Sequence, residues 1–490
     1  MQISRRSLLR GATAAAAIAP SLRASTTRPR FSDGKFNVIE IVIDSLSAHW
    51  IGAYGNTFVR TPNMDALAAK SVLFQDAYPN GLPTVLVRRG LYTGRQIFPA
   101  WMVAMREGGT GWRGWHPLYR EDAMQAESFQ AAGYATQLIS DVYHQFQPAM
   151  NFQFGFDCFR WIRGQEFDRD ATGPQCEIDV QAYLHPTTPG MANQVKTYLL
   201  NRHWWKTEED WSTHRLFNEA GNWLGQNLSD NNPFYLHIES YSPHEMWDPP
   251  EDYYRLFMKS DYNGPRLIFP PMRTDNMTAV EVEHVRALYA GMINFVDSRV
   301  GMFLQKVESL GLMDNTIIAL VADHGTFMGE QGDLHKAEGL LRTQLLHVPL
   351  MIYHPDYAGL GRKIKGFVQH QDVMPTLLDL NNMGIPKRVT GESLRPLMES
   401  GDSSHRDTIY GGWNNHGFVR TPEYSYLGRW NPGEAYEGIY DVAKDPLELN
   451  SLQSPPAGML DDFRTKLKNY VAAGWDTTKG NFLQVTPQSF

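Results

Sequence analysis

NVIEIVID, residues 37–44, is the stretch that decides the fold. It is rich in β-branched residues and ends on an acid, which is typical of a buried parallel strand whose C-terminal end delivers a functional carboxylate. A second run of this kind, NTIIALVA at 315–322, ends directly before Asp323, His324 and Gly325. Because the C-terminal ends of parallel strands meet at one edge of a sheet, Asp44, Asp323 and His324 are expected to converge. Each residue alone is more ordinarily a strand-end acid or a loop histidine, but together they predict a divalent-metal site.

Outward from these two runs, strand-like and helix-like segments alternate along the chain. The other expected strands are 136–140, 233–239 and 347–353, and the expected helices are 64–70, 127–133, 280–310 and 375–380. This alternation predicts an α/β fold with a large, mostly parallel sheet and helices on both faces. After about residue 386, short strands, turns and charged stretches dominate. We therefore expect a main domain over 31–385 and a smaller C-terminal α+β subdomain over 386–490.

The first 30 residues have the pattern of an export signal followed by a short linker. Arg5 and Arg6 form a twin-arginine pair before an alanine-rich apolar stretch at 11–20, and Ala24 offers a small residue for cleavage. This pattern is typical of a Tat signal, with a basic disordered tail as the alternative. It predicts passage through the Tat export machinery and a periplasmic or secreted protein. No later segment reaches the ~18 apolar residues of a spanning helix, so no stable membrane insertion is expected.

Composition argues against nucleic acid as a partner, and it leaves the state of the two cysteines and the oligomeric state open. The net charge is −8, and it becomes more negative when the arginines of the signal are removed, which argues against nucleic-acid binding. The two cysteines, Cys158 and Cys176, form either one disulfide or two thiols, because sequence spacing cannot show how far apart they lie. The sequence indicates no oligomeric state.

Several motifs, each weak alone, occur in an order that resembles the sulfatase family of the alkaline phosphatase superfamily. The resemblance runs from about residue 37 to about residue 452. Besides the opening strand, its motifs are Tyr54-Gly55-Asn56, Thr61-Pro62-Asn63-Met64-Asp65, Leu91-Tyr92-Thr93-Gly94-Arg95, Ala322-Asp323-His324-Gly325, Gly329-Glu330-Gln331-Gly332, Val348-Pro349-Leu350, Pro375-Thr376-Leu377-Leu378-Asp379, Gly391-Glu392-Ser393-Leu394, Tyr440-Asp441 and Asp445-Pro446. The resemblance implies an alkaline phosphatase-like fold and metal-dependent hydrolysis of a small anionic ester.

The resemblance places the family's nucleophile at Thr84, where most members carry a cysteine or serine. Leu86 stands at the family's proline position, and Ser45 stands at its second acidic position. Threonine cannot become the formylglycine aldehyde, so it must form an ester intermediate that water hydrolyses, as in the phosphodiesterase members. A threonine here is also an ordinary helix cap, and the two roles are compatible. The implied ligands of one divalent ion are Asp44, Thr84, Asp323 and His324. The imidazole slightly favours Mn²⁺ or Zn²⁺, while Ca²⁺ and Fe stay open.

Other positions match family residues that contact the transferred group. Arg88 is expected to hold its oxygens as a fork, with Lys336 beside it, and His244 is expected to protonate the leaving group. The alternatives are surface cations and a loop histidine. The family's Gly-Lys-Trp-His segment is absent, and Asp141 stands at its lysine.

The residues after Asp141 are expected to touch substrate. Tyr143 or His144 stands at the histidine of the missing segment, and both are predicted substrate contacts. Four aromatic residues either wall a pocket or fill the core: Trp112, Trp115, Tyr241 and Trp247.

The loss of the family lysine makes the expected site less positive, which suits a monoanionic group better than a phosphate monoester dianion. The sequence therefore favours a phosphodiester or phosphonate monoester hydrolase with Thr84 as nucleophile. The first alternative is a sulfate ester hydrolase that works without formylglycine. The second is a non-catalytic protein that binds an anionic ligand.

Overall fold

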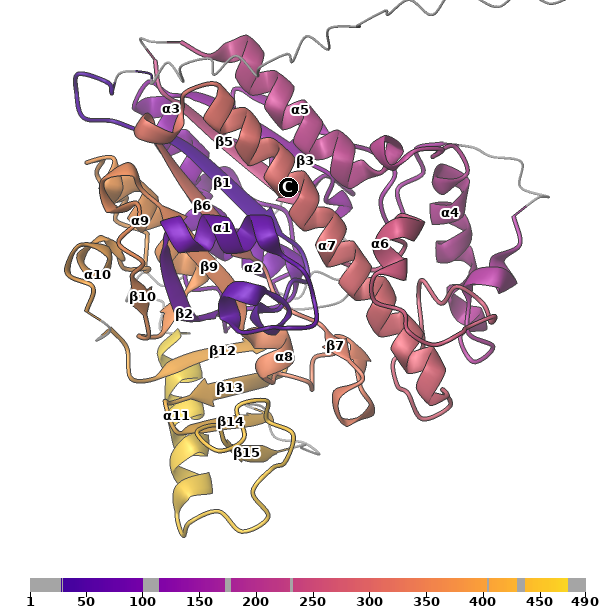
Figure 1. The fold of residues 1–490 in the computed structure, drawn as a ribbon. Coiled ribbons are helices and arrows are strands. Elements are labelled where there is room, and N and C mark those ends of the chain that lie inside the picture. Colours follow the sequence, from indigo (N-terminus) through magenta and orange to yellow (C-terminus); the bar gives the residue numbers. More distant parts are fainter. Residues whose placement is uncertain are drawn as a thin grey trace, which may run out of the picture.

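The computed structural model describes residue 28 and residues 30–99, 114–171, 178–229, 232–402, 405–429 and 437–474. In these residues the main domain is built on a nine-stranded sheet (Figure 1). Its strands lie in the order β10 (Lys363–Ile364), β2 (Val72–Tyr78), β9 (Val348–Tyr353), β6 (Thr316–Ala322), β1 (Asn37–Ile43), β5 (Phe234–Ser240), β3 (Ala135–Ser140) and β4 (Cys158–Trp161), and β11 (Val368–Gln369) also pairs with β2.

The sheet is mostly parallel, as predicted. Strand β1 lies in its middle and pairs in parallel with β5 on one side and β6 on the other. The exception is β9, which runs antiparallel to both β6 and β2. All five expected strands are present, and the four strands of this sheet that we did not predict are β4, β10, β11 and β2, of which β2 is the longest. Its sequence, VLFQDAY, contains two adjacent polar residues, Gln75 and Asp76, which break its apolar pattern.

Helices cover both faces of the sheet, also as predicted. One group contains α1 (Pro62–Lys70), α5 (Ser212–Asn227) and the long α7 (Ala279–Ser309), and α7 contacts both of the others (Figure 1). The other contains α2 (Thr84–Thr93), α3 (Gln125–Ala131) and α9 (Val373–Leu380). Helix α7 begins with a capping box in which Thr278 and Glu281 satisfy each other's backbone N–H groups. Shorter helices are α4 (Ala192–Arg202), α6 (Glu251–Arg255), α8 (Thr343–Leu346) and α10 (Arg395–Ser400).

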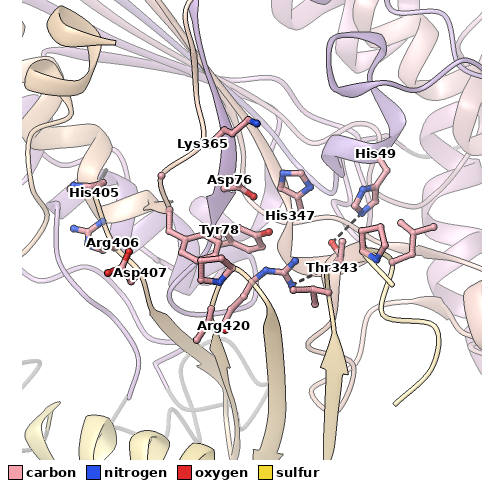
Figure 2. Close-up of a pocket in the computed structure, with 17 residues that line it drawn as sticks. His49, Asp76, Tyr78, Thr343, His347, Lys365, His405, Arg406, Asp407 and Arg420 are labelled. Carbon is pink, nitrogen blue, oxygen red and sulfur yellow. Dashed lines mark hydrogen bonds between the residues drawn. The ribbon is translucent and has the colours of Figure 1, made fainter. Parts of the chain in front are cut away.

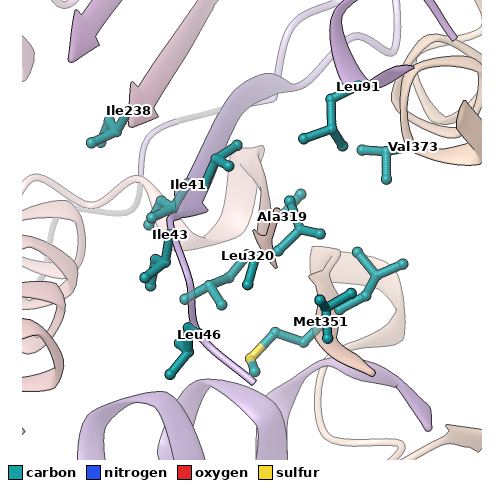
Figure 3. Packing of buried hydrophobic residues seen from close by; sticks show 14 of the residues in the cluster. Ile41, Ile43, Leu46, Leu91, Ile238, Ala319, Leu320, Met351 and Val373 are labelled. Carbon is teal, nitrogen blue, oxygen red and sulfur yellow. The ribbon is translucent and has the colours of Figure 1, made fainter. Parts of the chain in front are cut away.

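The core between these layers is apolar and closed to solvent. Figure 3 shows Ile41 and Ile43 of β1 in one cluster with Leu320 of β6, Leu91 of α2 and Val373 of α9. This packing fixes the ends of β1 and β6, and therefore the residues that follow them, relative to the start of α2.

The C-terminal part forms a second, antiparallel sheet. Its strands are β12 (Ile409–Trp413), β13 (His416–Arg420), β14 (Tyr424–Arg429) and β15 (Gly438–Asp441), and α11 (Met459–Gly474) packs against them (Figure 1). The other face packs on the main domain through an apolar cluster. This is the smaller α+β unit predicted from the sequence. Helix α10 still packs on α9, and the boundary at residue 386 stays a prediction.

Several sequence predictions fall on residues outside the described part. They concern the export signal at 1–30, apart from residues 28 and 30, together with Trp112 and Cys176. Cys158 is exposed, and its pairing with Cys176 stays open. Among the described residues, no helix combines the length and apolar character needed to cross a bilayer.

Candidate functional site

The structure brings together the three residues that follow β1 and β6. Asp44, Asp323 and His324 are buried, and their potential ligand atoms all lie within 4.8 Å of one another. The parallel pairing of β1 with β6 explains this, because it ends both strands at the same level. The turn behind His324 needs Gly325, since a Cβ there would lie 2.0 Å from the Gln344 carbonyl oxygen.

Hydrogen bonds hold Oδ1 of each aspartate, while Asp44 Oδ2 has an ion-pair contact with Arg88 but no hydrogen bond within the described part of the chain. The Ser45 hydroxyl donates to Asp44 Oδ1 at 2.9 Å, and the backbone N–H groups of Ser45 and His324 donate to Asp323 Oδ1 at 2.9 and 2.6 Å. His324 Nδ1 lies 2.8 Å from the Gly325 carbonyl oxygen, to which it donates. Among the described residues, Asp44 Oδ2 and His324 Nε2 are buried without a hydrogen-bond partner.

The charges of this cluster fit a divalent cation. Burial lowers the pKa of His324 to about 3, so its ring is neutral and Nε2 carries a free lone pair. Burial, and then the neighbouring Asp323, raise the pKa of Asp44. Asp44 and Asp323 share the single guanidinium of Arg88 with Glu239, so these two carboxylates and the neutral imidazole are short of positive charge, which a divalent ion would supply.

Thr84 is the first residue of α2 and faces a cavity of about 400 Å³. No hydrogen bond of its hydroxyl is found among the described residues. The helix N-terminus beside it favours negative charge on this oxygen. The cavity brings Thr84 together with His144, His244 and Lys336, whereas Tyr143 is not among its lining residues. Its lining is Pro83, Thr84, Trp115, His144, Glu166, Phe167, His244, Glu245, Met246, Phe269, Met272, His335, Lys336, Ala337, Glu338 and Trp413.

His244 and Lys336 form a hydrogen-bonded pair at the cavity wall. His244 Nδ1 lies 2.7 Å from the Glu245 carbonyl oxygen, and Nε2 lies 2.6 Å from Lys336 Nζ. Nδ1 therefore carries the ring proton, and the Lys336 ammonium donates to the unprotonated Nε2. The proton between Nζ and Nε2 is shared by the two residues. Burial alone would raise the pKa of the Glu245 carboxyl, but His244, Lys336 and His335 hold it well below its usual range.

Arg88 lies differently from our expectation. Its side chain is fully buried, and its nitrogens face three carboxylates: Asp44 at 3.1 Å, Glu239 at 2.9 Å and Asp323 at 2.7 Å. Nη1 also donates to the Thr84 carbonyl oxygen one helical turn earlier. A guanidinium engaged in this way is no open fork for the oxygens of a substrate. It links the first turn of α2 to both metal-site acids.

Of the three described aromatic residues from the sequence prediction, one lines the cavity and two pack against histidines of its wall. Trp115 lines the cavity, with its ring edge-on to His144 at 5.1 Å. His144 Nε2 lies 2.8 Å from Glu166 Oε2. Tyr241 and Trp247 are buried behind the wall, where their rings contact His244 and His335 at 4.3 and 4.9 Å.

Another cavity, of about 500 Å³, lies where the C-terminal sheet meets the main domain (Figure 2). Tyr78, His49 and His347 line it, and Arg420 reaches in from β13. None of the predicted site residues lines it. Its Arg420 guanidinium pairs with the buried Glu448.

Comparison with known proteins decides the family. A family model described as "Sulfatase" matches residues 36–383, and one described as "N-sulphoglucosamine sulphohydrolase, C-terminal" matches residues 329–473. The chain belongs to the sulfatase family.

Relatives of this sulfatase-family protein include both sulfatases and phosphonate monoester hydrolases. An arylsulfatase of Clostridium perfringens is 27% identical over 447 residues, which cover 85% of this chain and 90% of the relative. The solved phosphonate monoester hydrolase of Agrobacterium radiobacter has a TM-score of 0.68 at 21% identity and covers 90% of this chain and 95% of its own. A protein solved in complex with its substrate D-glucosamine-2-N,6-O-disulfate has a TM-score of 0.67 at 18% identity, covering 91% and 98%. The two structures show the shared alkaline phosphatase-like fold.

Family membership makes this chain an ester hydrolase. Sulfatases generally bind a divalent metal, and the cluster of Asp44, Asp323 and His324 fits one.

The sequence did not predict three buried acids that surround the site. Glu245 follows His244 directly, and Glu166 pairs with His144. Glu239 is the last residue but one of β5 and pairs with Arg88. An acid inside or at the end of an apolar strand was the available signal for Glu239, because a buried charge needs a partner.

Proposed function

We propose that this protein hydrolyses a phosphodiester or phosphonate monoester by attack of the Thr84 hydroxyl, with Asp44, Asp323, His324 and Thr84 as ligands of one divalent ion. The observation that carries the proposal is the position of Thr84. Thr84 begins a helix whose first turn Arg88 links to both aspartates, and it lines the same cavity as Lys336 and His244.

A divalent ion held there would lower the pKa of the Thr84 hydroxyl and neutralise charge on the transferred group. Thr84 Oγ then forms a bond to phosphorus as the bond to the leaving oxygen breaks. The Lys336–His244 pair gives a proton to that oxygen and takes up the proton that Thr84 loses, which restores the pair. Water hydrolyses the resulting threonyl ester and frees Thr84 for the next cycle.

The choice of ester rests on the nucleophile and on charge. A threonine cannot supply the aldehyde hydrate through which sulfatases release sulfate. Lys336 is the one lysine or arginine among the residues that line the cavity, and Arg88 is engaged with carboxylates. A monoanionic diester matches this charge better than a dianion does.

The organic part of the substrate would face an apolar wall. Trp115, Phe167, Phe269, Met272 and Trp413 line the cavity, and its glutamates oppose an anionic sugar chain. We therefore propose a compact, uncharged alcohol or phenol as the leaving group.

Sulfate ester hydrolysis without formylglycine is the second candidate. It is favoured by the family model and by the arylsulfatase relative. Both candidates use the same nucleophile and differ only in the transferred group.

One experiment separates the two candidates. The sulfate, phosphodiester and phosphonate monoester of a single phenol are given to the metal-loaded protein, to Thr84→Val, which keeps the shape without the hydroxyl, and to Thr84→Ser, which keeps the hydroxyl. Faster cleavage of the diester or phosphonate, lost in Thr84→Val and retained in Thr84→Ser, supports the proposal. Faster cleavage of the sulfate ester supports the second candidate, sulfate ester hydrolysis, instead. Cleavage that survives Thr84→Val excludes Thr84 as nucleophile.

We also propose export through the Tat pathway, on the strength of the Arg5-Arg6 pair and the apolar stretch behind it. Replacing both arginines by lysine should keep the protein in the cytoplasm with its signal uncleaved. Unchanged export of that variant excludes the Tat route.

A further inference from the structure

We propose that Glu239 is a positioning residue that holds Arg88 in place and sets the affinity of the metal site, as the middle member of a buried row of alternating charges. The row consists of Asp44 and Asp323, Arg88, Glu239, His237 and Glu40. The inference rests on the metal site of the proposed function, and it concerns residues that line no part of the substrate cavity.

The contacts of Glu239 occupy both of its carboxylate oxygens. Oε2 accepts from Arg88 Nε at 2.9 Å. Oε1 accepts from the Tyr92 hydroxyl at 3.1 Å and from Gln145 Nε2 at 2.8 Å, and His237 Nε2 lies 3.1 Å from it. The side chain is completely buried. Glu239 therefore cannot touch substrate, and its one link to the metal site passes through Arg88.

The sheet itself builds the rest of the row. Glu40 of β1 and His237 of β5 are register partners, and Glu239 lies two residues further along β5, so all three point to the same face. His237 Nδ1 lies 3.2 Å from Glu40 Oε2, to which the Tyr235 hydroxyl also donates at 2.8 Å. Although burial alone would lower it, Glu40 and Glu239 raise the pKa of His237 to about 9, and the ring is charged at neutral pH.

The order of charges explains what Glu239 does for the metal site. Arg88 contacts Asp44 and Asp323 directly, so its full positive charge would compete with a cation for those carboxylates. Glu239 pairs with the same guanidinium from behind, and His237 in turn keeps Glu239 ionised. Burial alone would raise the pKa of Glu239, but Arg88 and His237 lower it. With Glu239 in place, Arg88 orients the two aspartates without cancelling their attraction for an ion.

The test measures metal affinity rather than activity. Mn²⁺ is titrated calorimetrically into the EDTA-stripped wild type and into Glu239→Gln, which keeps the size of the side chain and removes its charge. We expect at least tenfold weaker binding in Glu239→Gln. A change of less than twofold overturns the inference.

The neighbouring arginine offers a matched control. Arg89, the next residue of α2, is also buried and pairs with Asp122 at 2.7 Å, with His116 on its other side. Asp122→Asn should cost comparable stability and leave the Mn²⁺ affinity within twofold of the wild type. If Asp122→Asn weakens binding as much as Glu239→Gln does, the effect is general destabilisation and the inference is wrong.

Two further variants test whether the effect passes through Arg88. In the double variant Arg88→Met, Glu239→Gln the competing cation is gone, so Mn²⁺ affinity should recover to at least the wild-type value, and persistent weak binding contradicts the mechanism. If Glu239→Gln does not fold, Tyr92→Phe removes one hydrogen bond to Glu239 and should weaken Mn²⁺ binding about two- to threefold, whereas unchanged affinity overturns the inference.

A wild type that binds no Mn²⁺ or Zn²⁺ removes the proposed metal site itself, and normal wild-type binding with an unaffected Glu239→Gln removes only this inference.

Discussion

Replacing Arg88 by methionine should destabilise the metal-free protein strongly and make its stability depend on metal. The change keeps most of the side-chain volume but leaves three buried carboxylates facing one another without the cation between them: Asp44, Glu239 and Asp323. Removing one partner of a buried ion pair costs ~3–5 kcal/mol. An unfolding entropy of ~2.1 cal/mol/K per residue gives about 1 kcal/mol/K for this chain of 490 residues. The unfolding temperature should therefore fall by about 3–5 °C if the chain unfolds as one unit.

The loss should depend on pH in a defined direction. Burial and Asp323 already raise the pKa of Asp44, and Arg88 opposes that rise. Without Arg88 the folded-state pKa of Asp44 rises further above the unfolded value of ~4. Such groups stabilise the fold most below their unfolded pKa, and that contribution is lost as pH rises through the folded pKa. The deficit of Arg88→Met relative to wild type should thus be largest at pH 8 and shrink towards pH 5.

Thermal unfolding in EDTA and in Mn²⁺ at several pH values measures both effects. Mn²⁺ should raise the unfolding temperature of Arg88→Met more than that of the wild type, because the ion replaces the missing charge. Arg89→Met is the control, since it also loses a buried ion pair but should gain no extra stabilisation from Mn²⁺. The reasoning is refuted if metal-free Arg88→Met unfolds within 1 °C of the wild type, or if Mn²⁺ rescues both variants equally.

Three other changes test separate parts of the site. His324→Ala should lower Mn²⁺ affinity by at least tenfold, as measured by calorimetry, because it removes the unpartnered Nε2; unchanged affinity excludes His324 as a ligand. His237 should make the wild type lose stability between pH ~6.5 and about 9, since its folded pKa is raised to about 9 and the stabilisation it gives is present below the unfolded value of ~6.5. In His237→Gln, thermal unfolding should show no such loss over that range, and a persisting loss would assign it to another group. Trp115→Ala and Trp413→Ala should raise KM for an aryl ester about tenfold with little change for a methyl ester of the same acid, and equal effects on both esters would contradict the apolar leaving-group wall.

The fold could be predicted where one physical signal dominated. The runs that became β1, β5 and β6 are rich in apolar and β-branched residues, so their burial and parallel pairing followed from sequence. Strand β2 escaped because two polar residues interrupt its run, and the antiparallel direction of β9 escaped because an apolar run carries no information on direction.

The site was predictable where residues adjoin strand ends and unpredictable where long-range pairing decides their role. Asp44, Asp323 and His324 met as expected because each follows a central strand. The orientation of Arg88 depends on Glu239, which lies 151 positions away in the chain, and nothing in the local sequence of either residue shows that they pair. The proton arrangement between Lys336 and His244 likewise follows only from three-dimensional contacts.

The balance of charges around Thr84 bears on which ester the protein accepts. Two aspartates neutralise a divalent ion, and Glu239 offsets Arg88, so neither leaves a net positive charge facing the cavity. Lys336 remains, shared with His244 and close to Glu245. A dianionic phosphate monoester would bring more negative charge than this site offsets, whereas a diester and a sulfate ester each bring one. Between those two, the fate of the threonyl intermediate decides: a sulfated threonine lacks the hemiacetal collapse that frees sulfate from formylglycine, and it must await direct attack by water. On the proposed mechanism a phosphorylated threonine is hydrolysed by direct attack of water at phosphorus and never needs that collapse, so the use of Thr84 as nucleophile would favour the phosphoester.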